Sequence, residues 1–126
     1  MNLSAPMNKV LYFFCPRSGT SHFWAQRLSA VGTLITSLWF VYAILNMPGF
    51  QYSDALTFIA APLNSIMLFF LIIVMAYHSS LGVQVVIEDY IHAHKLKLIT
   101  LILSRFMHVF FVAAAVYAII KIRLSI

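Results

Sequence analysis

Residues 62–90 read PLNSIMLFFLIIVMAYHSSLGVQVVIEDY. An apolar run, broken only by an asparagine and a serine near its start, leads directly into His78. On a helix that turns about 100° per residue, His78, Gly82 and Asp89 fall on one face, with Asp89 about 16 Å further along it. A histidine deep in so apolar a helix needs a partner. The segment therefore predicts a membrane-spanning helix that carries a functional imidazole.

The composition excludes a soluble domain. The chain has 126 residues, 63% of them hydrophobic and only 9% charged, with a mean hydropathy of +0.95. Soluble domains carry about 25% charged residues, and a soluble protein this small has no room to bury so much apolar surface. The single Cys15 excludes an internal disulfide. The basic residues behind the net charge of +5 do not cluster with aromatic residues on a soluble face, so no nucleic-acid partner is indicated.

Three apolar stretches are long enough to span a bilayer. We expect spans over residues 24–45, 62–90 and 98–120, after a cytoplasmic or interfacial leader over residues 1–23. A short interfacial helix, Ala55–Ala61, is expected before the second span, capped by Ser53 and Asp54. The predicted fold class is an all-α integral membrane protein with one domain.

The expected start of the first span combines capping residues with interfacial ones. Thr20 or Ser21 is a plausible N-cap, and Trp24 suits the membrane interface. Arg27 is then in the first turn, where its long side chain can snorkel to the surface.

The distribution of basic residues predicts an orientation. Lys and Arg occur before the first span, at its start and between spans two and three, but not between spans one and two; those beyond the third span are Lys121 and Arg123. By the positive-inside rule the N-terminus and the loop His92–Lys97 are cytoplasmic (or in the matrix) and the C-terminus lies outside. This orientation predicts Arg27, Asp89 and Tyr90 at the same membrane surface.

His78 admits two interpretations. A neutral histidine near mid-membrane can simply form a hydrogen bond to a neighbouring helix. Alternatively it ligates a heme iron, because Gly82 one turn later leaves room for a flat macrocycle. We favour the heme interpretation. His108 is the nearest candidate for a second ligand in this chain, but an interhelical hydrogen bond explains it better, so the second ligand is expected from another subunit.

The polar residues at the end of the second span suggest a quinone site. Tyr90 is either a belt aromatic or a donor to a quinone carbonyl, and Asp89 is either a helix-end residue or part of a proton relay. Arg27 is either an interfacial anchor or a partner for a heme propionate or Asp89, and His22 admits the same two interpretations.

The remaining polar residues are less informative. Arg105 lies inside the third span, where a charge is costly unless paired, and its partner is open between Glu88, a propionate and another subunit. Glu88, His92 and His94 are expected to be solvated. The sequence contains no nucleotide-binding glycine loop, zinc-ligand spacing or nucleophile elbow.

Two motifs resemble one known family. The sequence Ser21-His-Phe-Trp-Ala-Gln-Arg27 resembles the start of the first helix in the small hydrophobic membrane anchor subunit of bacterial succinate dehydrogenase. The pattern His78-x3-Gly82-x6-Asp89-Tyr90 is similar to that family's second-helix signature, with residues closest to those of the alphaproteobacterial and mitochondrial branch. The resemblance covers residues 18–97. The resemblance implies no role for Arg105 and His108 in the third span.

The resemblance implies a function and a set of partners. His78 would be the axial ligand of heme b, with the second histidine supplied by a cytochrome b556 anchor subunit that packs against this chain. Tyr90 would hydrogen-bond ubiquinone, Asp89 would line that site, and Arg27 would lie near both the quinone and the heme propionates. Gly82 and His22 would belong to the heme pocket.

The implied complex is succinate:ubiquinone oxidoreductase of the tricarboxylic acid cycle and respiratory chain, in the bacterial inner membrane. A flavoprotein subunit would oxidise succinate, and an iron–sulfur subunit would pass the electrons to quinone. The alternatives are a fumarate reductase anchor, a heme-free structural anchor, and a small proton-coupled transporter subunit in which His78, Asp89 and Arg105 form the proton path.

Overall fold

The computed structural model describes residues 19–125, which fold into four α-helices with no strand among them. The helices are α2 (Gly19–Leu45), α3 (Tyr52–Ala60), α4 (Pro62–Tyr90) and α5 (His94–Ser125). Three of these, α2, α4 and α5, are long and apolar enough to cross a membrane. The predicted fold class is therefore confirmed, including the short helix before the second span. Most of the predicted leader lies outside the described residues.

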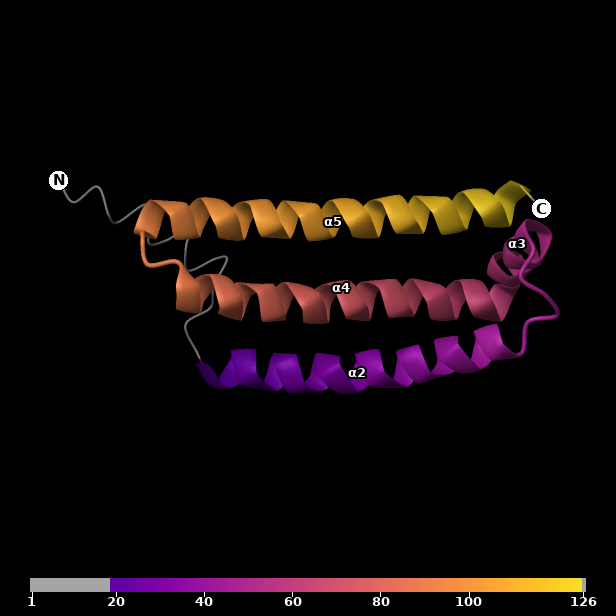
Figure 1. Cartoon of the computed structure of the whole chain (residues 1–126), viewed down its shortest axis with the longest axis horizontal. Helices are drawn as coiled ribbons and strands as arrows, with labels where there is room; N and C mark the ends of the chain where they lie inside the picture. Colours follow the sequence, from indigo (N-terminus) through magenta and orange to yellow (C-terminus); the bar gives the residue numbers. More distant parts are fainter. Residues whose placement is uncertain (1–18, 126) are drawn as a thin grey trace.

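Helix α4 is the centre of a single layer of antiparallel helices (Figure 1). It packs against α2 on one side and α5 on the other, while the backbones of α2 and α5 do not pack against each other. Among residues 19–125, seven are buried and five of those belong to α4, as expected for the middle helix. Large apolar side chains such as Leu38, Phe70 and Phe111 remain exposed. A layer of this kind needs lipid or other chains to cover its faces.

The boundaries of the central helix match the expected second span, but the two outer helices are longer than predicted. Helix α2 begins at Gly19, five residues before the expected membrane span and one or two residues before the expected N-cap, so Thr20 and Ser21 lie inside the helix and not at its cap. Arg27 is consequently the ninth residue of α2, in the third turn and not the first. Hydropathy marks only the part of a helix that lies in hydrocarbon, whereas backbone hydrogen bonding continues beyond it.

The predicted loop between the second and third spans is also mostly helical. Helix α5 begins at His94, four residues before the predicted start, and only residues 91–93 connect it to α4. The ammonium group of Lys97 donates to the backbone oxygen of Glu88 at 3.0 Å, which joins the end of α4 to the first turn of α5. The shorter connection keeps α4 and α5 close at this end of the layer.

Helix α3 crosses the opposite end of the layer (Figure 1), where it contacts α2, α4 and α5. It begins one turn earlier than predicted, because the Asp54 carboxylate accepts a hydrogen bond from the backbone N–H of Gln51 at 3.1 Å and so lies within the first turn. The Phe58 ring stacks on Trp39 of α2 with 6.4 Å between centroids. Arg123 of α5 donates to the backbone oxygen of Ala60. This end is thus fixed by contacts that do not involve the predicted functional residues.

A close approach between α2 and α4 occurs near the middle of α2. A Cβ atom added to Gly32 would lie 3.0 Å from Cγ1 of Val74, closer than ordinary van der Waals contact. Small residues are typical of such interfaces because they let two helix backbones approach each other. The glycine therefore sets the spacing of the helix pair that carries His78.

Candidate functional site

His78 lies near the middle of α4 and contacts α2. Its Nδ1 atom is 3.0 Å from the hydroxyl oxygen of Ser29, a residue only 7% exposed. The same hydroxyl is 3.1 Å from the backbone oxygen of Gln26. The other ring nitrogen, Nε2, makes no hydrogen bond to any residue in 19–125. The imidazole is therefore held by one nitrogen and keeps the other available.

The flank of α4 beside His78 is open at Gly82. A Cβ added to Gly82 would meet nothing within 4 Å, in contrast to Gly32. Gly82 is four residues after His78 and so about 40° around the helix from it. The open space and the available Nε2 atom are compatible with a flat ligand that lies along this part of α4.

Asp89 and Tyr90 close the C-terminal end of the same helix, and both are exposed. Asp89 is about 20° around the helix from Gly82 and Tyr90 about 80°, so both belong to the flank that includes the glycine. Neither makes a hydrogen bond to residues 19–125. Their side chains are therefore accessible to a ligand or to another chain at this end of the layer.

His22 lies on a different flank from Gly82, although both were predicted for one heme pocket. It lines a cleft of 360 Å³ between the three long helices, together with Gln84 and Arg105. Gln84 is two residues after Gly82 and thus about 200° around α4 from it. The Nε2 atom of His22 is buried and has no hydrogen-bond partner among residues 19–125. The structure thus separates the two residues, because the position of α2 relative to α4 directs His22 to the far side of the central helix.

A chain of hydrogen bonds links Arg105 to Glu88. Arg105 of α5 donates from Nη2 to Oε1 of Gln84 at 2.9 Å, and Gln84 donates from Nε2 to Oε1 of Glu88, also at 2.9 Å. Gln84 is only 5% exposed. Of the partners left open for Arg105, Glu88 is thus reached, but only through the buried amide of Gln84, which the sequence reasoning missed. No motif marks this glutamine, since its role depends on the position of α5.

Arg27 faces away from the central helix. It is two residues before Ser29, which contacts α4, and so points about 160° away from that contact. Its guanidinium carbon lies 4.7 Å from the centroid of the Phe23 ring. It forms no ion pair with Asp89 in the described part of the chain. Arg27 and Asp89 also lie at different depths, because Ser29 is level with His78, which is about 16 Å from Asp89 along α4. The predicted convergence of Arg27 with Asp89 and Tyr90 is therefore not formed within this chain.

His108 has both ring nitrogens occupied. Nδ1 is 2.7 Å from the backbone oxygen of Ser104, and Nε2 is 3.2 Å from the hydroxyl of Ser79 on α4. Ser79 follows His78 directly, so His108 lies at the depth of His78 but on another side of the central helix. The interhelical hydrogen bond expected for His108 is thus present.

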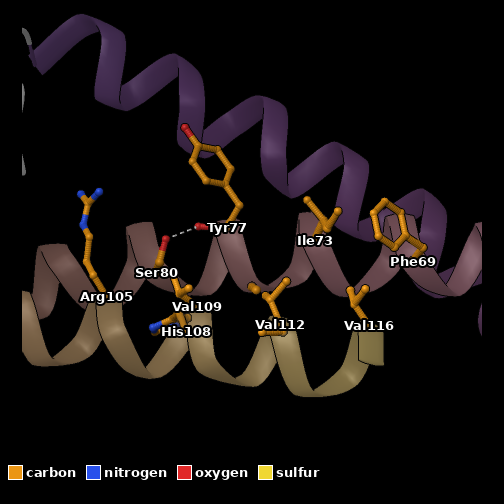
Figure 2. Close-up of a pocket in the computed structure, with 11 residues that line it drawn as sticks. Phe69, Ile73, Tyr77, Ser80, Arg105, His108, Val109, Val112 and Val116 are labelled. Carbon is orange, nitrogen blue, oxygen red and sulfur yellow. Dashed lines mark hydrogen bonds between the residues drawn. The ribbon is translucent and has the colours of Figure 1, made fainter. Parts of the chain in front are cut away.

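Arg105 and His108 stand at one end of an apolar groove between α4 and α5, with Phe69 and Val116 toward the other end (Figure 2). The groove has a volume of 510 Å³. Ser80 also lines it, and its hydroxyl donates to the backbone oxygen of Tyr77 in its own helix at 2.8 Å. The polar groups at this end are satisfied largely by the helices themselves.

Within residues 19–125, no group of three or more histidine, cysteine or acidic side chains gathers as a metal cluster. Two partly buried imidazoles among the described residues have a nitrogen that makes no hydrogen bond: His78, beside the open flank at Gly82, and His22, in the cleft beside Gln84. His22 lies on a different flank of α4 from Gly82, so the two imidazoles do not face one common site.

Comparisons with known proteins match most of the chain. The family described as succinate dehydrogenase/fumarate reductase transmembrane subunit matches residues 1–120. A succinate dehydrogenase hydrophobic membrane anchor subunit from Rickettsia bellii is 32% identical over 103 residues, which are 82% of each chain. The equivalent subunit of Rickettsia typhi is 30% identical over 103 residues, again 82% of each chain. A succinate dehydrogenase membrane anchor subunit from Reclinomonas americana is 28% identical over 100 residues, 77% of this chain and 83% of the relative. No solved structure matches the chain.

Proposed function

The chain belongs to the family of succinate dehydrogenase and fumarate reductase transmembrane subunits, and on this premise we propose that it anchors a succinate dehydrogenase, ligates heme b through His78 and forms one wall of a ubiquinone site at Asp89 and Tyr90. The anchoring role agrees with three helices that are long and apolar enough to cross a membrane. The curated relatives carry the name of succinate dehydrogenase, which favours the direction of succinate oxidation over fumarate reduction.

The observation that carries the heme proposal is the state of His78. One ring nitrogen contacts Ser29 at 3.0 Å, and the other makes no hydrogen bond within residues 19–125. Gly82 leaves open space one turn away. A neutral imidazole with an available nitrogen is a good axial ligand for heme iron. When bound, heme b supplies an iron that accepts and releases single electrons.

The partner that completes the site is proposed to be the cytochrome b556 anchor subunit. Neither His108 nor His22 is placed to complete the site, since both nitrogens of His108 are engaged and His22 lies in the cleft on another side of α4. The single layer leaves α4 uncovered on two flanks, so a second anchor chain has a surface on which to pack. Arg27 points away from α4. It would therefore contact a heme propionate or the quinone only on the side of α2 that the partner subunit covers. His22, with its buried Nε2 atom, would hydrogen-bond a propionate only from the cleft beside Gln84.

The quinone proposal rests on the chemistry of the exposed end of α4. Ubiquinone takes up two electrons and two protons, so its site needs a hydrogen-bond donor at a carbonyl and a path for protons. The Tyr90 phenol can donate to the carbonyl while its ring packs on the apolar part of the ligand. The Asp89 carboxylate can orient water and relay protons from the surface. The location of both residues at a helix end keeps them within reach of water.

The proposed complex passes electrons from a flavoprotein subunit through an iron–sulfur subunit to ubiquinone. Helices α2 and α5 begin at the end of the layer where α4 finishes, which brings Lys95 and Lys97 to the end that carries Tyr90 (Figure 1). By the positive-inside rule this end is proposed to be cytoplasmic, with the C-terminus in the periplasm of a bacterium with an inner membrane. The iron–sulfur subunit would then dock on the surface that exposes Asp89 and Tyr90.

Replacement of His78 tests the proposal. The His78→Ala variant is purified with its partner subunits, and its heme content is measured beside that of His92→Ala, an exposed histidine outside the helices. We expect His78→Ala to lose or alter the b-type heme spectrum while the subunits still co-purify, and His92→Ala to keep it. A wild-type spectrum in His78→Ala would reject ligation. If the wild-type complex itself contained no heme, only the role of a structural anchor would remain.

A further inference from the structure

Two hydrogen bonds meet at the hydroxyl oxygen of Ser29, and together they determine where the protons are. One joins it to Nδ1 of His78 at 3.0 Å and the other to the backbone oxygen of Gln26 at 3.1 Å. A serine hydroxyl has one proton to donate, and a carbonyl oxygen has none. If both bonds form, the hydroxyl donates to Gln26 and accepts from His78.

This proton count selects one tautomer of the imidazole. His78 must carry its proton on Nδ1, which leaves a lone pair on Nε2. The opposite tautomer would lose the bond between Ser29 and Gln26 and would place a proton on Nε2. Only the first tautomer can ligate a metal through Nε2, so the arrangement with more hydrogen bonds is also the one that is competent for ligation.

The position of Ser29 is fixed by the packing around it. Its side chain is only 7% exposed. One turn further along α2, Gly32 approaches Val74 so closely that an added Cβ would be 3.0 Å from a methyl carbon. Because the helices touch here, the hydroxyl has little freedom to move relative to the imidazole.

We propose that Ser29 is a positioning residue for the heme ligand: it fixes the tautomer and the ring orientation of His78 and raises the basicity of its Nε2 atom. This inference rests on the proposed function of His78. A hydrogen bond from the far ring nitrogen of a ligating histidine orients the ring and increases its basicity. A more basic ligand favours the oxidised iron, so the bond from His78 to Ser29 lowers the reduction potential of the heme.

The test is a potentiometric titration of heme in the purified complex. Ser29→Ala removes the acceptor, so we expect an upward shift of the midpoint potential. Thr36→Ala is the matched control, since the Thr36 hydroxyl on the same helix donates to the backbone oxygens of Gly32 and Thr33 in its own helix. We expect wild-type potential in the control, and Ser29→Thr, which keeps a hydroxyl, to stay nearer to wild type than Ser29→Ala.

The outcomes separate this inference from the proposed function. An unchanged potential in Ser29→Ala, beside lost heme in His78→Ala, would overturn only the role of Ser29. A wild-type heme spectrum in His78→Ala would reject the proposed function itself. If Ser29→Ala does not assemble, Ser29→Cys replaces it, because the thiol has a similar shape but is a weak acceptor. An upward shift in Ser29→Cys supports the inference, and an unchanged potential overturns it.

Discussion

Arg105 of α5 donates a hydrogen bond to the buried amide oxygen of Gln84 in α4, at 2.9 Å. The same amide donates to the Glu88 carboxylate at 2.9 Å, so a neutral side chain connects a cation to an anion across more than one helical turn. A charged group in a membrane helix is costly unless it is compensated. The contact therefore explains how α5 carries an arginine in an apolar span and how it is held in register against α4.

The first prediction concerns this contact. Gln84→Leu removes an acceptor from Arg105 and a donor from Glu88, so we expect the free energy of unfolding of the complex to fall by about 1.5–3 kcal/mol. The double variant Arg105→Met/Gln84→Leu should lose less than the sum of its single changes, with a coupling of about 0.5–3 kcal/mol. Thermal denaturation in detergent measures both, with Lys121→Met, a change at an exposed residue, as the control for lost charge. Additive effects of the two substitutions would show that the contact does not contribute.

The second prediction concerns Tyr90. In Tyr90→Phe the ring remains but the donor to the quinone is lost, so we expect quinone reduction to slow roughly tenfold, as for the loss of about 1.4 kcal/mol. Succinate oxidation with an artificial electron acceptor should be unaffected, because that reaction does not use the quinone site. The matched control is Tyr117→Phe, at another exposed tyrosine in α5. Equal losses in both assays would argue against a role of Tyr90 in quinone binding.

The third prediction uses the open space at Gly82. A Cβ atom added there meets nothing within 4 Å in this chain, so we expect Gly82→Leu to leave the fold of the chain intact. A heme that lies against this flank would be displaced, and we expect the heme content per complex to fall. Measurement of heme against subunit protein decides the result. Full heme content in Gly82→Leu would place the macrocycle away from this glycine.

The fourth prediction concerns the close approach of α2 and α4. In Gly32→Ala the new Cβ lies 3.0 Å from a methyl carbon of Val74, so the Val74 side chain or its helix must give way by a few tenths of an ångström, and we expect a destabilisation of about 1–3 kcal/mol. Val74→Ala removes the contacting methyl groups and should restore much of the loss when the two changes are combined. Thermal denaturation of the single and double variants measures the rescue. A double variant no more stable than Gly32→Ala would show that Val74 is not the obstacle.

The fifth prediction separates His108 from His78. Both nitrogens of His108 are engaged by Ser104 and Ser79, so His108→Ala should keep the heme spectrum and lose only an interhelical hydrogen bond, worth about 0.6 kcal/mol. Absorption spectra of the oxidised and reduced complex check this expectation. A changed heme spectrum in His108→Ala would argue that His108 is a heme ligand.

The pattern of apolar residues by itself was enough to determine the number of spans, the bounds of α4, and a helix before it. It determined these features because a backbone in hydrocarbon must satisfy its own hydrogen bonds, so a long apolar stretch has to be a helix. The same rule explains the errors at Gly19 and His94. Outside the hydrocarbon the helix continues, and hydropathy no longer reports on it.

Only the tertiary structure decided which side chains meet. It paired Ser29 with His78 and Gln84 with Arg105, and it turned His22 and Arg27 away from the flank that holds Gly82. Each of these outcomes depends on the register and rotation of one helix against another. A change of one residue in register turns a side chain by about 100°, and in a membrane the apolar pattern does not distinguish a surface that faces protein from one that faces lipid.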